Sequence, residues 1–203
     1  MTEENVCIFG DSITWGAWDR EMGGWLNRLR IFIENDNYPF IIYNNGVSCD
    51  TTRDLLERFN VECEAREPRV IIFAIGINDA MLCYNNGELM VKEEEFKDNL
   101  EKLLKLAANQ CGKIIFTGLT KINEEIYKQN DGIKEGDAFF GNGNIKKYNL
   151  IIKEFAKENN LLFIELFDLI KDSDLEDGLH PNAQGHEKIF QKVKECLIEE
   201  EII

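Results

Sequence analysis

Short apolar runs alternate along the chain with longer segments in which apolar residues recur every three or four positions. The short runs are nearly uninterrupted and rich in Ile, Val and Phe, which is typical of strands that are covered on both faces. Five of them are predicted as strands: residues 6–9, 39–43, 69–75, 113–119 and 161–166.

The longer segments are predicted as helices because their apolar side chains fall on one face of a 3.6-residue period. A strand followed by a helix, repeated along the chain, favours right-handed crossovers and therefore a parallel sheet with helices on both faces. No internal repeat or linker interrupts the pattern, so residues 1–203 are predicted to form one three-layer α/β domain. The helical segments are residues 25–33, 50–59, 96–107, 145–155 and 189–197.

One section, roughly residues 120–144, shows neither the strand pattern nor the helix pattern; it is polar and contains several glycines. A long irregular loop in a compact domain is often functional. Ligands of open parallel sheets bind beyond the carboxyl ends of the strands. The residues that follow each apolar run are therefore the first candidates for chemistry.

Polar residues suited to acyl transfer follow four of the predicted strands. Ser12 comes after the first strand, Gly46 after the second and Asn78 after the third, while Asp177 and His180 share a loop near the end of the chain. Taken singly, each has an ordinary interpretation as a helix cap, a turn residue or a solvated loop residue. Taken together, they supply a hydroxyl nucleophile, a base, a carboxylate to orient that base, and donors for an oxyanion.

The segments around these residues resemble the ordered signature blocks of the SGNH hydrolases, also called the GDSL esterase/lipase family. The blocks "FGDSITWG", "NNGVSCDTT", "AIGINDA" and "DGLHPNAQGH" occur in family order between residues 9 and 186. The resemblance implies that Ser12 is the nucleophile, His180 the general base and Asp177 the residue that orients His180. It also implies three oxyanion donors: the backbone N–H groups of Ser12 and Gly46 and the side-chain amide of Asn78. The implied fold is flavodoxin-like, with strand order 2-1-3-4-5, and the implied chemistry needs no cofactor.

The chain departs from the family pattern at two positions near the expected pocket. Cys49 stands where many relatives carry Gly, and Lys121 stands where many carry Pro. Neither departure touches the expected chemistry. Both bear on which substrate would fit.

Four neighbours of the motifs have competing interpretations. Asp11 is adjacent to the nucleophile, where a structural hydrogen-bonding role is expected. His186 is expected to cap the last helix or lie on its surface. Trp15 and Trp18 follow the nucleophile and are predicted either to wall an apolar pocket or to pack the first helix onto the sheet.

Composition narrows the possible partners and the compartment. The chain carries 38 acidic residues against 23 Lys and Arg, a formal net charge of −15, which argues against nucleic acid and anionic membranes as partners. The N-terminal "MTEENVCIFG" has no basic export region, so a cytoplasmic protein is expected. Its six scattered cysteines are then expected to be free thiols. No residues have the spacing of a metal site or of a dinucleotide-binding loop.

The sequence therefore predicts a serine hydrolase that cleaves carboxylic esters of small molecules through an acyl-enzyme. Short acyl esters, including acetyl groups on sugars, are the first expectation. A lysophospholipase or thioesterase could use the 120–144 loop as a longer acyl groove. An acyltransferase would use the same apparatus with an alcohol in place of water, and a flavodoxin-like binding module is the non-enzymatic alternative. The pattern makes no prediction of an oligomeric state.

Overall fold

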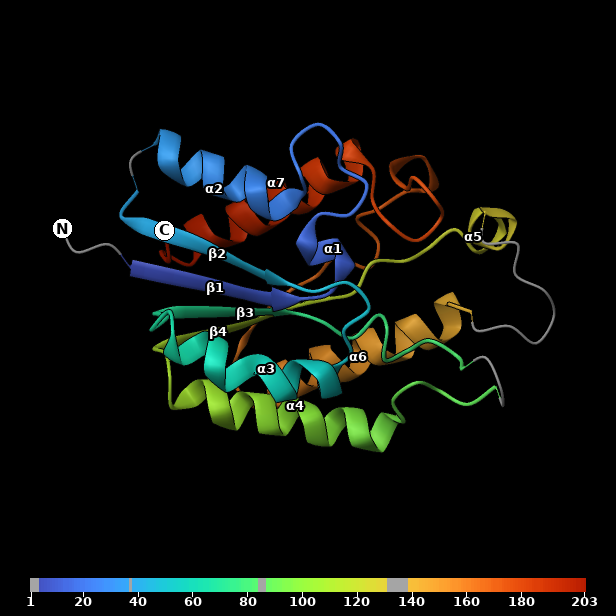
Figure 1. Ribbon diagram of the computed structural model, residues 1–203, viewed down its shortest axis with the longest axis horizontal. Helices are drawn as coiled ribbons and strands as arrows, with labels where there is room; N and C mark the ends of the chain where they lie inside the picture. Colours follow the sequence, from blue (N-terminus) through green and yellow to red (C-terminus); the bar gives the residue numbers. More distant parts are fainter. Residues whose placement is uncertain (1–3, 37, 84–86, 131–138) are drawn as a thin grey trace.

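Five parallel strands form the middle layer of the molecule, in the order β2-β1-β3-β4-β5 (Figure 1). The computed structural model describes residues 4–36, 38–83, 87–130 and 139–203. The strand order and the parallel direction confirm the fold that the sequence predicts. The strands are β1 (Glu4–Gly10), β2 (Phe40–Gly46), β3 (Val70–Ala74), β4 (Lys113–Thr117) and β5 (Leu162–Ile164).

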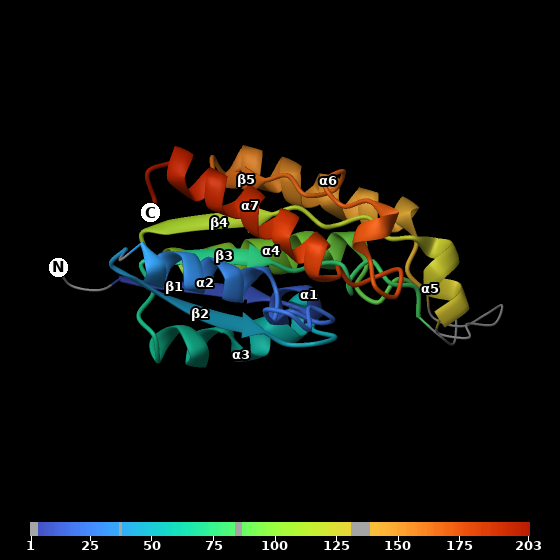
Figure 2. The same ribbon diagram turned by 90° about the horizontal axis from the view of Figure 1, so that it is seen from above.

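Helices cover both faces of this sheet, as Figures 1 and 2 show. On one face lie α2 (Trp25–Asn35) and α7 (Ala183–Glu199). On the other lie α3 (Thr52–Glu64), α4 (Glu93–Ala108) and α6 (Asn142–Glu158). Shorter elements stand at or beyond the carboxyl ends of the strands: α1 (Ser12–Trp15), α5 (Glu124–Asn130) and the 3₁₀ helix η1 (Asp172–Asp174).

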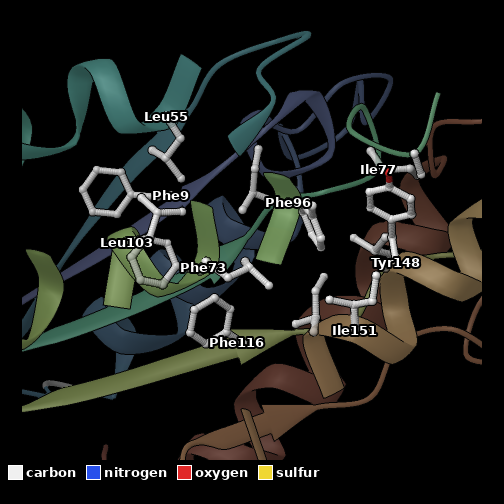
Figure 3. Packing of buried hydrophobic residues seen from close by; sticks show 14 of the residues in the cluster. Phe9, Leu55, Phe73, Ile77, Phe96, Leu103, Phe116, Tyr148 and Ile151 are labelled. Carbon is white, nitrogen blue, oxygen red and sulfur yellow. The ribbon is translucent and has the colours of Figure 1, made fainter. Parts of the chain in front are cut away.

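The strand register explains why the apolar runs are continuous. Phe9, Phe73 and Phe116 are paired across β1, β3 and β4, and their rings form a row beneath α3 and α4, seen in Figure 3. The ring centroids of Phe9 and Phe73 are 6.1 Å apart, and those of Phe73 and Phe116 are 5.0 Å apart. The alternate strand residues, such as Ile8 and Ile72, pack against α2 and α7. Because both faces are buried, neither needs polar residues.

The described part of the poorly patterned section, residues 120–130 and 139–144, is largely regular. It contains α5 and the start of α6, while residues 131–138 lie outside the described part. The side chain of Asn123 accepts a hydrogen bond from the Ile126 N–H at 2.9 Å, which caps α5. No helix in the described part of the chain is long and apolar enough to cross a membrane.

Candidate active site

Ser12 is the first residue of α1, immediately beyond the carboxyl end of β1. The preceding Asp11 is the N-cap of this short helix, and its carboxylate accepts the Ile13 N–H at 2.9 Å. Burial raises the pKa of Asp11 to about 6. As the N-cap of α1, Asp11 has the structural hydrogen-bonding role that the sequence predicts for it. A Cβ at Gly46 would come within 2.3 Å of the Trp15 nitrogen, so glycine there lets α1 sit directly on the end of β2.

His180 and Asp177 meet Ser12 from the loop before α7. The Ser12 Oγ lies 3.0 Å from His180 Nε2, and His180 Nδ1 lies 2.6 Å from Asp177 Oδ2. The other carboxylate oxygen accepts the backbone N–H groups of Leu179 at 2.9 Å and His180 at 2.7 Å. Burial opposes ionisation of Asp177, but these hydrogen bonds, led by the one from the His180 ring, lower its pKa to about 2.

An ionised Asp177 next to Nδ1 favours the imidazole tautomer with its proton on Nδ1. The Nε2 atom then carries a lone pair toward the Ser12 hydroxyl and can accept its proton. The three residues that sequence reasoning selected are thus brought together in the geometry that general-base activation of a serine requires.

The loop that carries Asp177 and His180 is held by α5. Gly178 has a φ of 92°, and a Cβ there would lie 2.4 Å from the Tyr127 nitrogen, so only glycine fits without movement. The Asn123 N–H donates to the Gly178 carbonyl at 2.8 Å. The segment that the sequence left unpatterned therefore supports the loop that carries Asp177 and His180.

Asn78 contributes a buried side-chain amide to the wall of the cavity beside Ser12. Its Nδ2 donates one hydrogen to the Asp50 carbonyl at 2.9 Å, which fixes the amide plane and leaves its second N–H without an acceptor among the described residues. Asp79, the next residue, is fully buried and accepts hydrogen bonds from the Thr52 N–H and hydroxyl. Burial raises the pKa of Asp79 to about 7. Asp79 thus anchors the start of α3 to the loop after β3 that carries Asn78.

Gly46 is placed differently from the other predicted donors. Its N–H donates to Asn44 Oδ1 at 2.9 Å, and it is absent from the residues that line the Ser12 cavity. Cys49 does line that cavity, and it has a φ of 69°, a conformation that favours glycine. In the described part of the chain its N–H has no hydrogen-bond acceptor. The glycine that many relatives carry at this position is the sequence signal that could have identified it, but the sequence-based prediction placed the donor at Gly46.

A cavity of about 560 Å³ opens beside Ser12, Asn78 and His180. Its walls are mostly apolar. The indoles of Trp15 and Trp18 stand at this cavity with 58% and 45% of their residue surface exposed. They therefore wall the cavity and do not pack α1 onto the sheet. The apolar lining also includes Ala17, Met81, Met90, Phe140 and Leu179.

The loop between α1 and α2 is held in place by a buried ion pair and by a buried histidine. Asp19 and Arg28 form an ion pair of 2.9 Å, and both side chains are at least nine-tenths buried. His186, fully buried on the first turn of α7, has Nε2 2.9 Å from the Ala17 carbonyl and accepts the Trp25 N–H on Nδ1 at 3.2 Å. The expectation of a cap or surface role for His186 is wrong, because α2 and the loop cover this turn. Burial lowers the pKa of His186, in keeping with a neutral ring.

Other reactive groups in the described residues are not arranged as a second site. No cluster of three His, Cys, Asp or Glu side chains there could hold a metal ion. All six cysteines are free thiols, and burial raises the pKa values of Cys7 and Cys63 to about 12.

Comparison with known proteins gives a family and a set of relatives. The model of the GDSL-like lipase/acylhydrolase family matches residues 8–188 of this chain. A multidomain esterase of Ruminococcus flavefaciens is 32% identical over 126 residues, which are 60% of this chain and 14% of that protein. An acetylxylan esterase of Geobacillus stearothermophilus is 26% identical over 161 residues, which are 71% of this chain and 66% of that protein.

Solved structures with this fold include Axe2, an acetylxylan esterase from Geobacillus stearothermophilus. It aligns with a TM-score of 0.74 at 21% identity, covering 96% of this chain and 94% of that chain. LAE5, an alpha/beta hydrolase enzyme from the metagenome of Lake Arreo, aligns with a TM-score of 0.71 at 21% identity and covers 95% and 94% of the two chains. At these identities the structures support the fold.

Proposed function

Since this chain belongs to the GDSL-like lipase/acylhydrolase family, we propose that it hydrolyses carboxylic esters with Ser12 as nucleophile, His180 as general base and Asp177 as the residue that orients the base. The observation that carries the proposal is the continuous chain of contacts from Ser12 Oγ to His180 Nε2, 3.0 Å, and from His180 Nδ1 to Asp177 Oδ2, 2.6 Å. A binding module would need none of these contacts.

The proposed reaction has two halves. In the first, Ser12 Oγ bonds to the ester carbonyl carbon while its proton passes to His180 Nε2, and Asp177 stabilises the imidazolium that forms. The tetrahedral oxyanion collapses, the ester C–O bond breaks, and His180 returns the proton to the leaving alcohol. In the second half, water attacks the acyl carbon while His180 takes a proton from it. The bond between the acyl carbon and Ser12 Oγ then breaks, and His180 returns the proton to Ser12 Oγ as the acid leaves.

The backbone N–H of Ser12 and the free N–H of Asn78 are the first two proposed oxyanion donors. For the third, the N–H of Cys49 is better placed than that of Gly46, because the Gly46 N–H is already paired with Asn44. Cys49 lines the cavity beside Ser12 and Asn78, and its left-handed backbone lies in the tight turn that precedes Asp50.

Cys49→Gly is expected to retain wild-type kcat and nearly wild-type stability. Glycine keeps the N–H and removes the strain of a left-handed cysteine, about 1 kcal/mol, which offsets glycine's greater flexibility in the unfolded chain. Steady-state rates and thermal midpoints measure both effects. Cys49→Val is the contrasting variant, because its branched side chain disfavours this backbone and should lower both values. Loss of activity in Cys49→Gly would instead assign a role to the thiol.

The substrate we propose is an acetyl ester of a sugar. The names of the relatives support this: one is a multidomain esterase and another an acetylxylan esterase. The exposed indoles of Trp15 and Trp18 offer flat apolar faces against which the C–H groups of a sugar ring can pack. Trp18 also lines a second, polar hollow of about 380 Å³, together with residues that include Arg20 and Glu176, and this hollow suits further hydroxyl groups.

A second candidate is hydrolysis of longer acyl esters, as in a lysophospholipase or thioesterase. The observation in its favour is the apolar lining of the 560 Å³ cavity, which includes Met81, Met90 and Phe140. Methionine side chains adapt to flexible apolar ligands. A sugar and a long acyl chain would compete for the same space, so acyl-chain preference separates the two candidates.

In a series of p-nitrophenyl esters from acetate to palmitate, kcat/KM is expected to be highest for acetate. It should fall by at least about 10-fold by octanoate, since even a single methylene that does not fit costs about 1–3 kcal/mol. Acetylated xylose should be deacetylated by the same preparation. A profile that peaks at octanoate or longer would favour the second candidate. Chromatography of products formed with added alcohol distinguishes hydrolysis from acyl transfer.

A further inference from the structure

Arg58 of α3 is the one cation that contacts the ends of both β1 and β2 in the described structure. Its guanidinium is four-fifths buried and donates to the carbonyls of Asn45 at 2.9 Å and Gly10 at 3.3 Å. It also donates to the carboxylates of Asp50 at 2.7 Å and Glu62 at 2.9 Å.

Two of the segments that meet at this guanidinium carry proposed oxyanion donors, and the third donor is held by one of them. Gly10 stands two residues before Ser12. Asp50 follows Cys49 directly, and its carbonyl accepts the Asn78 amide at 2.9 Å. Arg58 therefore links the Ser12 and Cys49 segments directly, and the Asn78 amide through the turn at Asp50. The relative positions of these groups determine where an oxyanion would be held.

We propose that Arg58 is a positioning residue that sets the spacing of the oxyanion donors; this inference rests on the proposed function of the site. Arg58 is not among the residues that line the cavity, so it acts through the backbone of Gly10 and the turn at Asp50. Oxyanion donors work because they are fixed before the reaction begins, and a displacement of about 1 Å can cost about 10²-fold in rate.

The chemistry of the side chain fits this role. A guanidinium has five N–H donors in a rigid plane, whereas a lysine ammonium is a compact charge on a flexible stem. Two carbonyls and two carboxylates approach Arg58 from different elements, and a lysine of the same charge cannot keep the fork that reaches them. The charge balance with Asp50 and Glu62 would survive the substitution, while the geometry would not.

The test compares Arg58→Lys with wild type on p-nitrophenyl acetate. We expect kcat to fall by about 10- to 100-fold with KM within about threefold, since the oxyanion forms only after substrate is bound. Arg66→Lys is the matched control, because Arg66 contacts the same Glu62 but lies beyond the far end of α3. It should keep the wild-type kcat. Circular dichroism and thermal midpoints report whether each variant folds.

A double-mutant cycle separates positioning from general destabilisation. If Arg58 acts through the donors, the combined loss in Arg58→Lys with Asn78→Ala should be much smaller than the product of the two single losses. A multiplicative loss, or wild-type kcat in Arg58→Lys, would overturn the proposal. Should Arg58→Lys fail to fold, Asp50→Asn decides: it keeps the carbonyl that holds Asn78 but loses the charge that holds Arg58. We expect a loss of about 10-fold for it, and wild-type kcat would overturn the proposal.

These outcomes are distinct from failure of the proposed function. An enzyme that depends on Ser12 but is indifferent to Arg58 would remove only the present inference. Hydrolysis that does not depend on Ser12 would remove the proposed function itself.

Discussion

Ser12→Ala is expected to lower kcat for p-nitrophenyl acetate by at least about 10⁴-fold, because removal of the nucleophile from an acyl-transfer site leaves only binding and oxyanion stabilisation. Ser12 carries the hydroxyl that lies 3.0 Å from Nε2 of His180, the one imidazole among the described residues that line the cavity. Loss of one oxygen at the first position of α1 leaves the Asp11 cap intact. The variant should therefore fold normally and still bind substrate.

The matched control is Ser48→Ala. Ser48 lines the same cavity and undergoes the same chemical change, but no hydrogen bond joins it to His180 in the described structure. It should keep the wild-type kcat. Active-site labelling with a fluorophosphonate, followed by mass spectrometry, should modify Ser12 in the wild type and in Ser48→Ala, and nothing in Ser12→Ala. A rate above about 1% of wild type in a freshly purified Ser12→Ala preparation would exclude Ser12 as the nucleophile, given the loss expected for a nucleophile.

The strands and the meeting of Ser12, Asp177 and His180 could be predicted because each depends on local pattern. Apolar runs covered on both faces mark the strands, and parallel strands bring the residues after them to one edge of the sheet. The order of the strands is a different matter. Hydrophobic periodicity does not encode which strands are neighbours, so that prediction came from the resemblance of four sequence blocks to a family.

The parts that escaped prediction depend on contacts between distant segments. His186 is polar and lies on the first turn of a helix, a pattern typical of a surface residue. Its burial results from the loop between α1 and α2, which supplies the Ala17 carbonyl and the Trp25 N–H as partners. The supporting role of α5 is of the same kind, because it depends on the close packing of Gly178 against Tyr127.

Cys49 and Arg58 show a further limit. The backbone conformation of Cys49 is unusual for its residue type. The glycine of relatives at this position was taken to bear only on substrate fit, so the third donor was predicted at Gly46. In the sequence, Arg58 is one of several charged residues on an amphipathic helix, and nothing distinguishes it from the others. In the structure its side chain is directed inward and donates to two carbonyls and two carboxylates. A helical period of charged residues predicts a solvent-exposed face and does not identify the member that is buried.

Asn78→Ala is expected to lower kcat by about 10²–10³-fold with KM within about threefold, the usual result of removing one oxyanion donor. The hydrogen bond to the Asp50 carbonyl is lost as well, which should cost about 1 kcal/mol of stability. Steady-state kinetics and denaturant unfolding measure the two effects separately. Asn149→Ala is the control, because Asn149 is also buried and its side chain also holds a loop, by accepting the Leu119 N–H at 2.8 Å. It should lose stability and keep kcat.

Asn78→Asp distinguishes a donor from a residue that only fills space. Aspartate has the same shape, but it has no N–H for the oxyanion and would place an oxygen against the Asp50 carbonyl. If Asn78 donates to the developing charge, this variant should lose at least as much activity as Asn78→Ala, because a negative carboxylate repels the oxyanion. If Asn78 serves only to pack the cavity wall, aspartate should restore activity that alanine loses. The order of the two rates therefore decides between the roles.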